Sequence, residues 1–231
     1  MHATLSVGML GTGWVGASVA ISILHSGFAS ELLLSDVKSD VAEGEAMDLA
    51  HGASFYPTAE VRAVPFDELL DTSALVISAG RGGKPNETRL DLLRDNARVL
   101  GDIGAKLRGY RGLVIVVTNP VDVHTWVVAK RSGLPPERVI GTGTMLDTAR
   151  LRQALSTRLG VSPNSVHAQV IGEHGKGQAH NSSRSLTARS QLAMSNTSPG
   201  QNPAGSTYAI SLPSSNSRSA SLVDNCLSSP E

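Results

Sequence analysis

Residues 5–16 of the 231-residue chain are LSVGMLGTGWVG, an apolar run that passes directly into three closely spaced glycines. The apolar run predicts a buried strand, and the spacing of apolar residues over 15–25 predicts a helix. The glycines have the G-x-G-x-x-G spacing of a strand-to-helix turn. In such a turn Gly11 allows the tight bend, Gly13 allows close approach of a pyrophosphate to the backbone, and Gly16 allows close helix–strand packing.

Asp36 follows the next apolar stretch, residues 31–35, and lies twenty residues after Gly16. A carboxylate at this place accepts hydrogen bonds from the ribose hydroxyls of an adenosine group and repels a 2′-phosphate. An ordinary strand–turn–helix with a solvated aspartate is the alternative. The glycine turn and Asp36 together, at this spacing, favour a dinucleotide site, and the carboxylate favours NAD over NADP as the dinucleotide.

Apolar bursts alternate with helical patterns through residues 1–175, which is typical of repeated β–α units around a parallel sheet. We expect strands at 5–10, 31–35, 61–64, 74–79, 113–117 and 166–171, and helices at 15–25, 41–51, 88–108, 121–131 and 145–159. The helix over 88–108 has an apolar stripe formed by Leu90, Leu93, Ala97, Leu100, Ile103 and Leu107. The fold class is therefore α/β, a doubly wound parallel sheet of the Rossmann dinucleotide-binding type.

The composition argues against several classes of partner. Twenty Lys and Arg residues balance twenty Asp and Glu residues, so nothing favours nucleic acid or an anionic membrane as the main partner. The longest apolar run, residues 113–117, is far shorter than the roughly 20 residues of a membrane-spanning helix. Cys226 is the only cysteine and cannot form an internal disulfide, so we expect a reducing, cytoplasmic location. The seven histidines show no ligand pair at i, i+4, and we expect no metal site.

The composition changes after Gly175. Residues 176–231 contain 15 serines but only seven Leu, Ile, Val or Phe residues among 56. So few apolar side chains cannot offset the entropy lost on ordering the chain. The sequence therefore predicts a Ser-rich, disordered tail over 176–231.

Three polar groups follow predicted strands or begin a predicted helix. Asn119 lies at the carboxyl end of the strand over 113–117, where open α/β sheets place their ligands. Asp147 and Arg150 are three residues apart on one helix, and His174 lies between two glycines. An exposed ion pair and a loop histidine are the simpler interpretations. A histidine held by a carboxylate also exchanges a proton near neutral pH, and an arginine beside it can bind a carboxylate through two parallel hydrogen bonds.

The chain resembles the lactate and malate dehydrogenase family, and within it the bacterial L-lactate dehydrogenases. The matching segments are GTGWVG (11–16), EGEAMDL (43–49), KPNETRLDLL (84–93), TNPVD (118–122), GTGTMLDTAR (141–150) and IGEHG (171–175). They occur in the family's order and at its spacing from residue 4 to residue 175. The resemblance implies reversible hydride transfer between NADH and pyruvate to give L-lactate, in an enzyme that commonly forms homodimers or tetramers.

The resemblance also implies roles for individual residues. His174 is expected to donate the proton to pyruvate and to accept it from lactate, while Asp147 fixes its tautomer. Arg150 is expected to bind the substrate carboxylate, and Asn119 to hydrogen-bond the substrate. Arg89, carried by a mobile loop from about Gly80 to Glu87, is expected to polarise the carbonyl when the loop closes. The implied cofactor contacts are Gly11, Gly13, Val15, Gly16, Asp36, Gly80, Val117 and Asn119.

Arg152 and His167 match the positions at which bacterial L-lactate dehydrogenases bind fructose 1,6-bisphosphate, so the resemblance implies an allosteric site there. Surface charge is the alternative interpretation of these two residues.

The loop departs from the family where it meets the substrate. Gly83 stands where lactate dehydrogenases usually have Gln and malate dehydrogenases have Arg. It offers no cation to a second carboxylate and leaves room for a larger 2-oxo acid. The neighbouring Arg81 is a candidate replacement for that cation, so a malate or other 2-hydroxy-acid dehydrogenase stays an alternative.

The resemblance stops after Gly175, before most of the family's substrate domain. We therefore expect an NAD-binding domain over 1–143, the start of a substrate domain over 144–175 and the tail over 176–231. The abrupt change leads to the hypothesis of a frame-shifted C-terminus, which resequencing with the same reading frame would refute. A catalytically inactive NAD-binding fragment is the second alternative.

Overall fold

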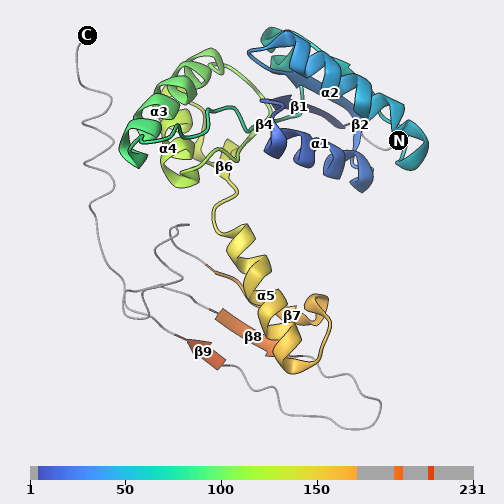
Figure 1. The fold of residues 1–231 in the computed structure, drawn as a ribbon, viewed down its shortest axis with the longest axis vertical. Helices are drawn as coiled ribbons and strands as arrows, with labels where there is room; N and C mark the ends of the chain where they lie inside the picture. The colour runs from blue at the N-terminus through green and yellow to red at the C-terminus, as the bar shows by residue number, and fades with distance from the viewer. Residues whose placement is uncertain (1–4, 171–189, 195–207, 211–231) are drawn as a thin grey trace. The chain divides into compact units, whose positions relative to one another are not determined.

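The computed structural model describes residues 5–170, 190–194 and 208–210, and the chain divides into two compact units, Met1–Thr142 and Gly143–Glu231 (Figure 1). The first unit is a six-stranded parallel sheet in the order β3-β2-β1-β4-β5-β6. Its strands are β1 (Leu5–Leu10), β2 (Ala29–Ser35), β3 (Glu60–Ala63), β4 (Ala74–Ile77), β5 (Leu113–Val116) and β6 (Val139–Gly141). Its helices are α1 (Trp14–Ser26), α2 (Ser39–His51), α3 (Arg89–Lys106) and α4 (Val121–Ser132), with 3-10 turns η1 (Ala53–Phe55), η2 (Phe66–Asp71) and η3 (Pro136–Arg138).

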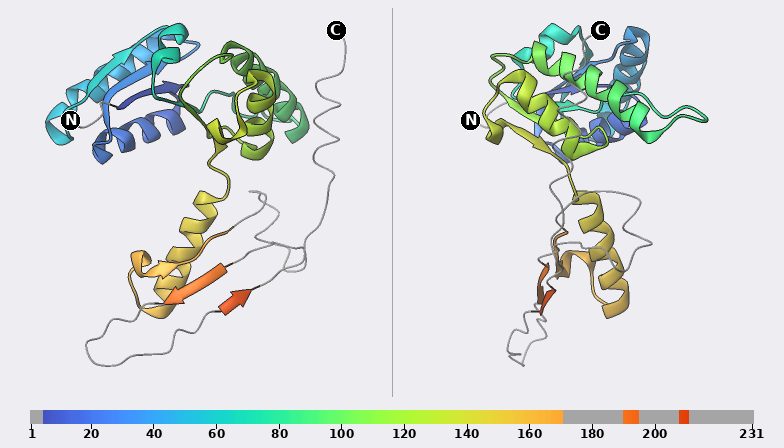
Figure 2. Two further views of the ribbon diagram at one scale, coloured as in Figure 1. Left: turned by 180° about the vertical axis from the view of Figure 1, so that it is seen from behind. Right: turned by 90° about the vertical axis from the view of Figure 1, so that its left-hand side faces the viewer.

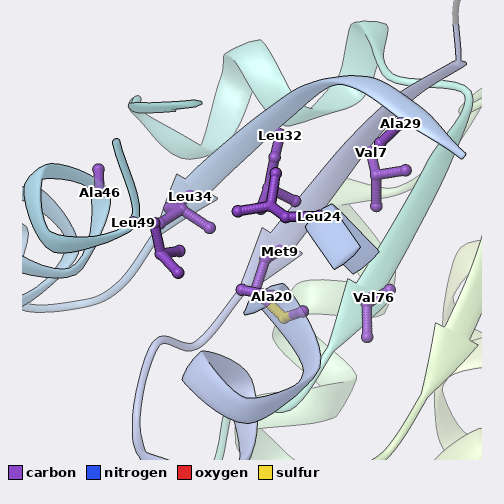
Figure 3. Packing of buried hydrophobic residues seen from close by; sticks show 10 residues of the cluster. All are labelled: Val7, Met9, Ala20, Leu24, Ala29, Leu32, Leu34, Ala46, Leu49 and Val76. Atoms are coloured by element: carbon purple, nitrogen blue, oxygen red, sulfur yellow. The ribbon is translucent and has the colours of Figure 1, made fainter. Parts of the chain in front are cut away.

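The core of the first unit forms where helices cover the central strands. The strands are buried on both faces, which explains their nearly continuous apolar sequences. Figure 3 shows the packing of ten buried side chains from β1, α1, β2, α2 and β4. The cluster consists of Val7, Met9, Ala20, Leu24, Ala29, Leu32, Leu34, Ala46, Leu49 and Val76. Helices α3 and α4 lie side by side against each other (Figure 1).

The strand order places a crevice at the middle of the sheet. The chain runs outward from β1 through β2 to β3 and then returns to pair β4 with the other side of β1. The carboxyl ends of neighbouring strands are level, because the N–H of Gly11 donates to the Ser35 carbonyl (2.8 Å) and that of Ser78 to the Leu10 carbonyl (2.9 Å). In an open α/β sheet, ligands bind at this edge, where the strand order reverses.

The second unit contains α5 (Met145–Leu159), the 3-10 turn η4 (Pro163–Ser165), and a sheet of β7 (Val166–His167), β8 (Ser190–Met194) and β9 (Tyr208–Ile210). Both strand pairs in this sheet are antiparallel. Strands β8 and β9 lie within 176–231, the range for which the composition predicts a disordered tail, and the rest of that range is outside the described residues. Strand β8 is held by backbone hydrogen bonds to β7, and residue composition alone does not predict such pairing.

The expected fold class is confirmed, but the sequence analysis missed β6, a strand of only three residues at the edge of the parallel sheet, and β7 lies in the separate antiparallel sheet. The other differences concern element ends. Strand β4 ends at Ile77 rather than residue 79, and the Ser78 hydroxyl that follows it donates to the Gly11 carbonyl of the glycine turn (2.8 Å). The strand expected over 166–171 is only Val166–His167 as far as the described residues extend. Among the described residues, no helix combines the length and apolar composition needed to cross a membrane.

Candidate functional site

The glycine turn between β1 and α1 gives each glycine different surroundings. Gly11 has φ +93°, and an added Cβ would lie 2.6 Å from the backbone nitrogen of Ala79. A Cβ on Gly16 would lie 2.0 Å from the Gly11 carbonyl oxygen, so this position must stay bare for α1 to pack on the turn. A Cβ on Gly13 would meet nothing within 4 Å, because Gly13 borders open space at the start of α1. The unpaired N–H groups at this helix end suit an anion.

Asp36 lies directly after β2 and is tied to the glycine turn. Its Oδ2 accepts a hydrogen bond from the Thr12 backbone N–H (2.8 Å), and its Oδ1 accepts one from the Lys38 backbone N–H (3.1 Å). The Thr12 hydroxyl also donates to Oδ2 (3.4 Å). A carboxylate can accept about four hydrogen bonds, two on each oxygen, so these contacts leave acceptor capacity on Oδ1. The residue is thus fixed in place while still able to accept hydrogen bonds from ribose hydroxyls.

A cavity of about 580 Å³ opens at this edge of the first unit, within the size range of small-molecule and cofactor sites. Four of the predicted cofactor residues line it: Gly11, Gly13, Asp36 and Gly80. Among the described residues, the cavity lining does not include Val15, Gly16, Val117 or Asn119. Gly16 instead packs behind Gly11, and Val117 packs against the core cluster.

Helix α3 forms a wall of the cavity that the sequence analysis missed. It contributes Asp95, Asn96, Val99, Asp102, Ile103 and Lys106. Ile103, expected in the apolar core stripe, lines the cavity, and Leu90 is exposed. A second apolar pair at i, i+4, Val99 and Ile103, is the signal that could have identified this face. Lys106 Nζ lies 5.2 Å from the ring centre of Phe66, which also lines the cavity.

The carboxyl ends of β4 and β5 are joined through Thr118. Its hydroxyl donates to the Ala79 carbonyl (2.7 Å), and its methyl group would lie 2.8 Å from a Cβ on Gly80. The Thr118 carbonyl oxygen lies 3.0 Å from Nδ1 of His124, which is on the first turn of α4. Asn119, expected to bind substrate, is the next residue in the chain and is exposed.

His124 is completely buried, and its Nε2 has no hydrogen-bond partner. Burial lowers the pKa of this imidazole, and the backbones of Thr118 and Leu93 counter the lowering only in part. The ring is therefore neutral near pH 7, with Nδ1–H as the donor to Thr118. No pattern in the sequence indicates that this histidine is buried, because a histidine in an amphipathic helix is buried or exposed according to the packing of its neighbours.

The loop between β4 and α3 carries two further predicted residues. Gly83 is exposed, and a Cβ there would make an ordinary contact of 3.6 Å with Leu92. Arg89 is the first residue of α3, which Thr88 caps by accepting a hydrogen bond from the Asp91 N–H (3.1 Å). The position of the Arg89 side chain lies outside the described structure.

In the second unit, α5 brings Asp147 and Arg150 together, with 3.5 Å between Oδ1 and Nη1. The Arg150 side chain is 65% exposed and that of Asp147 is 22% exposed. This geometry is that of an ion pair on one helix face, and the arginine keeps donors free toward solvent. His174, the expected proton donor, lies outside the described residues.

The segment that leads toward His174 is bonded to α5 and its N-cap. The Val170 N–H donates to the Thr148 hydroxyl (3.0 Å), and the Thr144 hydroxyl donates to the Val170 carbonyl (2.5 Å). Arg152, one of the two expected allosteric residues, donates from Nε to the Ala168 carbonyl (2.9 Å). His167, the other, is exposed and directly precedes Ala168.

The cavity of the first unit fits a dinucleotide. Gly13 borders space that a side chain would fill, the start of α1 offers N–H donors, and Asp36 offers acceptors. Val99 and Ile103 give α3 an apolar surface suited to a planar base.

Comparisons with known proteins agree with this geometry. The sequence profile of the lactate/malate dehydrogenase NAD-binding domain matches residues 5–141, and that of the family's alpha/beta C-terminal domain matches residues 144–197. The L-lactate dehydrogenase of Fervidobacterium nodosum is 46% identical over 173 residues, which are 74% of this chain and 56% of that protein. The L-lactate dehydrogenase of Geobacillus kaustophilus is 46% identical over 73% of this chain and 54% of that protein. The chain thus spans about half the length of the curated relatives it matches.

Solved structures give the same result. The minor L-lactate dehydrogenase of Enterococcus mundtii superposes with a TM-score of 0.72 and 37% identity, covering 82% of this chain and 58% of that one. The malate dehydrogenase of Picrophilus torridus has a TM-score of 0.70 and 33% identity, covering 75% of this chain and 56% of that one. With its glycine turn, Asp36 and cavity in the matched region, the chain belongs to the lactate/malate dehydrogenase family and carries that family's NAD-binding domain over residues 5–141.

Proposed function

We propose that this protein is an NAD-dependent L-lactate dehydrogenase that interconverts pyruvate and L-lactate. The observation that carries the proposal is the cavity at the carboxyl edge of the sheet, where the glycine turn, Asp36 and Gly80 meet in a chain of this family. NAD, when bound, supplies the acceptor or donor of the hydride. The chain's own residues orient the reactants, exclude water and move one proton.

The proton is assigned to His174, which donates it to the carbonyl oxygen of pyruvate and accepts it from the hydroxyl of lactate. Asp147 holds the imidazole in the required tautomer and stabilises its charged form. Arg150 binds the substrate carboxylate through two hydrogen bonds. Arg89 polarises the reacting carbonyl, and Asn119 donates a hydrogen bond to the same oxygen.

Two observations in the second unit support the assignment of His174 and Asp147 to one site. Val170 is bonded on both sides of Asp147, to Thr144 and Thr148. Four residues of chain then lead to His174, and even a fully extended chain of that length spans at most about 14 Å. The free donors of Arg150 lie on the same helix face as Asp147.

A malate or other 2-hydroxy-acid dehydrogenase is the second candidate, favoured by the similarity to the Picrophilus torridus enzyme.

We further propose that fructose 1,6-bisphosphate binds at Arg152 and His167 in an oligomer, and that the protein is cytoplasmic. The hydrogen bond from Arg152 to the carbonyl of the residue after His167 supports a common site for these two residues.

The test is NADH binding and NADH oxidation by the purified 231-residue protein. Pyruvate, oxaloacetate and a branched 2-oxo acid are offered in parallel, with and without fructose 1,6-bisphosphate. We expect turnover of pyruvate, and a loss of about 10²- to 10⁴-fold in a His174→Asn variant that still binds NADH. NADH binding without turnover of any oxo acid would instead identify a catalytically inactive NAD-binding fragment.

A further inference from the structure

The loop between β4 and α3 is a narrow projection (Figure 2). Arg81 lies near the start of the loop and Glu87 near its end, and their side chains form a two-pronged ion pair. Asp95, on α3, pairs with the same guanidinium. These three residues, which we call the Arg81 triad, hold the start of the loop, its end and α3 together.

Every N–H of the Arg81 guanidinium has an acceptor, four in the triad and one at the Gly82 carbonyl. Nη1 donates to Glu87 Oε2 (2.8 Å) and to the Gly82 carbonyl (3.3 Å), and Nη2 donates to Glu87 Oε1 and to Asp95 Oδ2 (2.5 Å). Nε donates to Asp95 Oδ2 (3.1 Å). A guanidinium has five N–H donors, so none remains for a further anion.

The backbone of Arg81 is fixed as well. Its N–H donates to Asn96 Oδ1 (2.9 Å), and its carbonyl accepts from Asn96 Nδ2 (3.1 Å). Arg81, Asp95 and Asn96 all line the cofactor cavity. Two members of the triad, Arg81 and Asp95, therefore border the cofactor cavity of the first unit, with the guanidinium bound to the protein's own carboxylates.

The local charge disfavours a second anion. One guanidinium faces two carboxylates, and a further cation, Arg98, lies 3.7 Å from the other oxygen of Asp95 and is largely exposed. The hydrogen bonds from Arg81 and the backbone of Lys84 lower the pKa of Glu87 to about 2, so the pair stays charged at every working pH. Lys84, the loop's other cation, is exposed. Its ammonium group is a hydrated point charge and cannot bind a carboxylate through two parallel hydrogen bonds, as a guanidinium can.

We propose that the Arg81 triad selects substrate: by occupying the guanidinium, it denies a second carboxylate its partner and restricts the site to 2-oxo acids with one carboxylate. The inference rests on the proposed function. Gly83, two residues after Arg81, has no side chain of its own and so leaves space for an uncharged group of the substrate. Removing both acids frees Arg81 to bind a dicarboxylic acid.

The experiment compares four proteins: the parent, the double variant Glu87→Gln/Asp95→Asn, the triple variant that adds Arg81→Gln, and a matched control. The control is Glu31→Gln/Glu60→Gln, which removes two acids from Arg62, to which each is bonded at 2.8 Å. Arg62 and its partners do not line the cavity among the described residues. Thermal unfolding first verifies that each variant is folded.

Two readouts are measured on NADH-loaded protein. The first is the ratio of kcat/KM for oxaloacetate to that for pyruvate. The second needs no turnover and is the ratio of affinities for tartronate, an unreactive dicarboxylate, and oxamate, an unreactive monocarboxylate. In the double variant both ratios are expected to rise about tenfold or more, the effect of one newly available charge-assisted pair. The triple variant returns to the parent's ratio, and the Arg62 control stays at it.

Equal ratios in the parent and the double variant overturn the inference, as does a rise that persists without Arg81 or appears equally in the control. A parent that turns over neither substrate refutes the proposed function alone, and the affinity ratio then decides the inference. If neither anion binds to any of the four proteins, the inference fails too.

Discussion

Replacing Gly16 by alanine is expected to destabilise the first unit, whereas the same replacement at Gly13 is expected to weaken cofactor binding and leave the fold intact. The new Cβ at Gly16 would lie 2.0 Å from the Gly11 carbonyl oxygen and 2.8 Å from the Ser78 hydroxyl. The first contact is with backbone that also forms the turn, so it cannot be relieved by rotating a side chain. Overpacking costs about 1–3 kcal/mol, and this case belongs at the upper end.

Gly13 differs because its Cβ would meet nothing within 4 Å, and its φ of −68° and ψ of −174° suit alanine. The poorer N-cap and the reduced freedom of the unfolded chain offset each other, so stability is expected to change by less than about 1 kcal/mol. The methyl group would occupy the space that the pyrophosphate needs. If that clash costs about 1–3 kcal/mol, NADH affinity falls by about 5- to 150-fold.

Thermal unfolding and NADH titration of both variants test these expectations. For a chain of this size, about 3 kcal/mol corresponds to a Tm lower by about 6–12 °C for Gly16→Ala, while Gly13→Ala stays within about 4 °C of the parent. A Gly16→Ala protein with the parent's Tm would refute the steric argument. A Gly13→Ala protein with the parent's NADH affinity would refute the assignment of the open space to the pyrophosphate.

Two further predictions concern buried polar groups. Because the folded state lowers the pKa of His124, it disfavours the protonated form, so the histidine's contribution to stability is complete above about pH 6.5 and is lost as the pH falls. Urea unfolding from pH 8 to pH 5 should show a smaller loss of stability in His124→Leu than in the parent, and equal slopes would count against this account. Thr148→Val should leave the buried Val170 N–H without its acceptor and cost the second unit about 1–3 kcal/mol in the same assay. An unchanged midpoint would show that this hydrogen bond contributes nothing to stability.

The sequence alone determined the features that depend on near neighbours in the chain. Strands β1, β2, β4 and β5 can be predicted from their apolar runs, because strands buried on both faces have few polar residues. The turn at Gly11–Gly16 is equally local, since a strand that passes at once into a helix needs glycine at fixed offsets. The position of Asp36 at the end of the second strand is also predictable, because the length of one β–α–β unit sets its distance from the glycine turn.

The tertiary structure alone decided what depends on packing between distant segments. Which face of α3 meets the core, and therefore that Val99 and Ile103 line the cavity, depends on how α3 packs against α4 and the sheet. The burial of His124 has the same origin. The partners of Arg81 are 6 and 14 residues away, and sequence reasoning treated this arginine as a free cation. A side chain's charge is fixed by its residue type, but its availability depends on which groups the fold places within hydrogen-bonding distance.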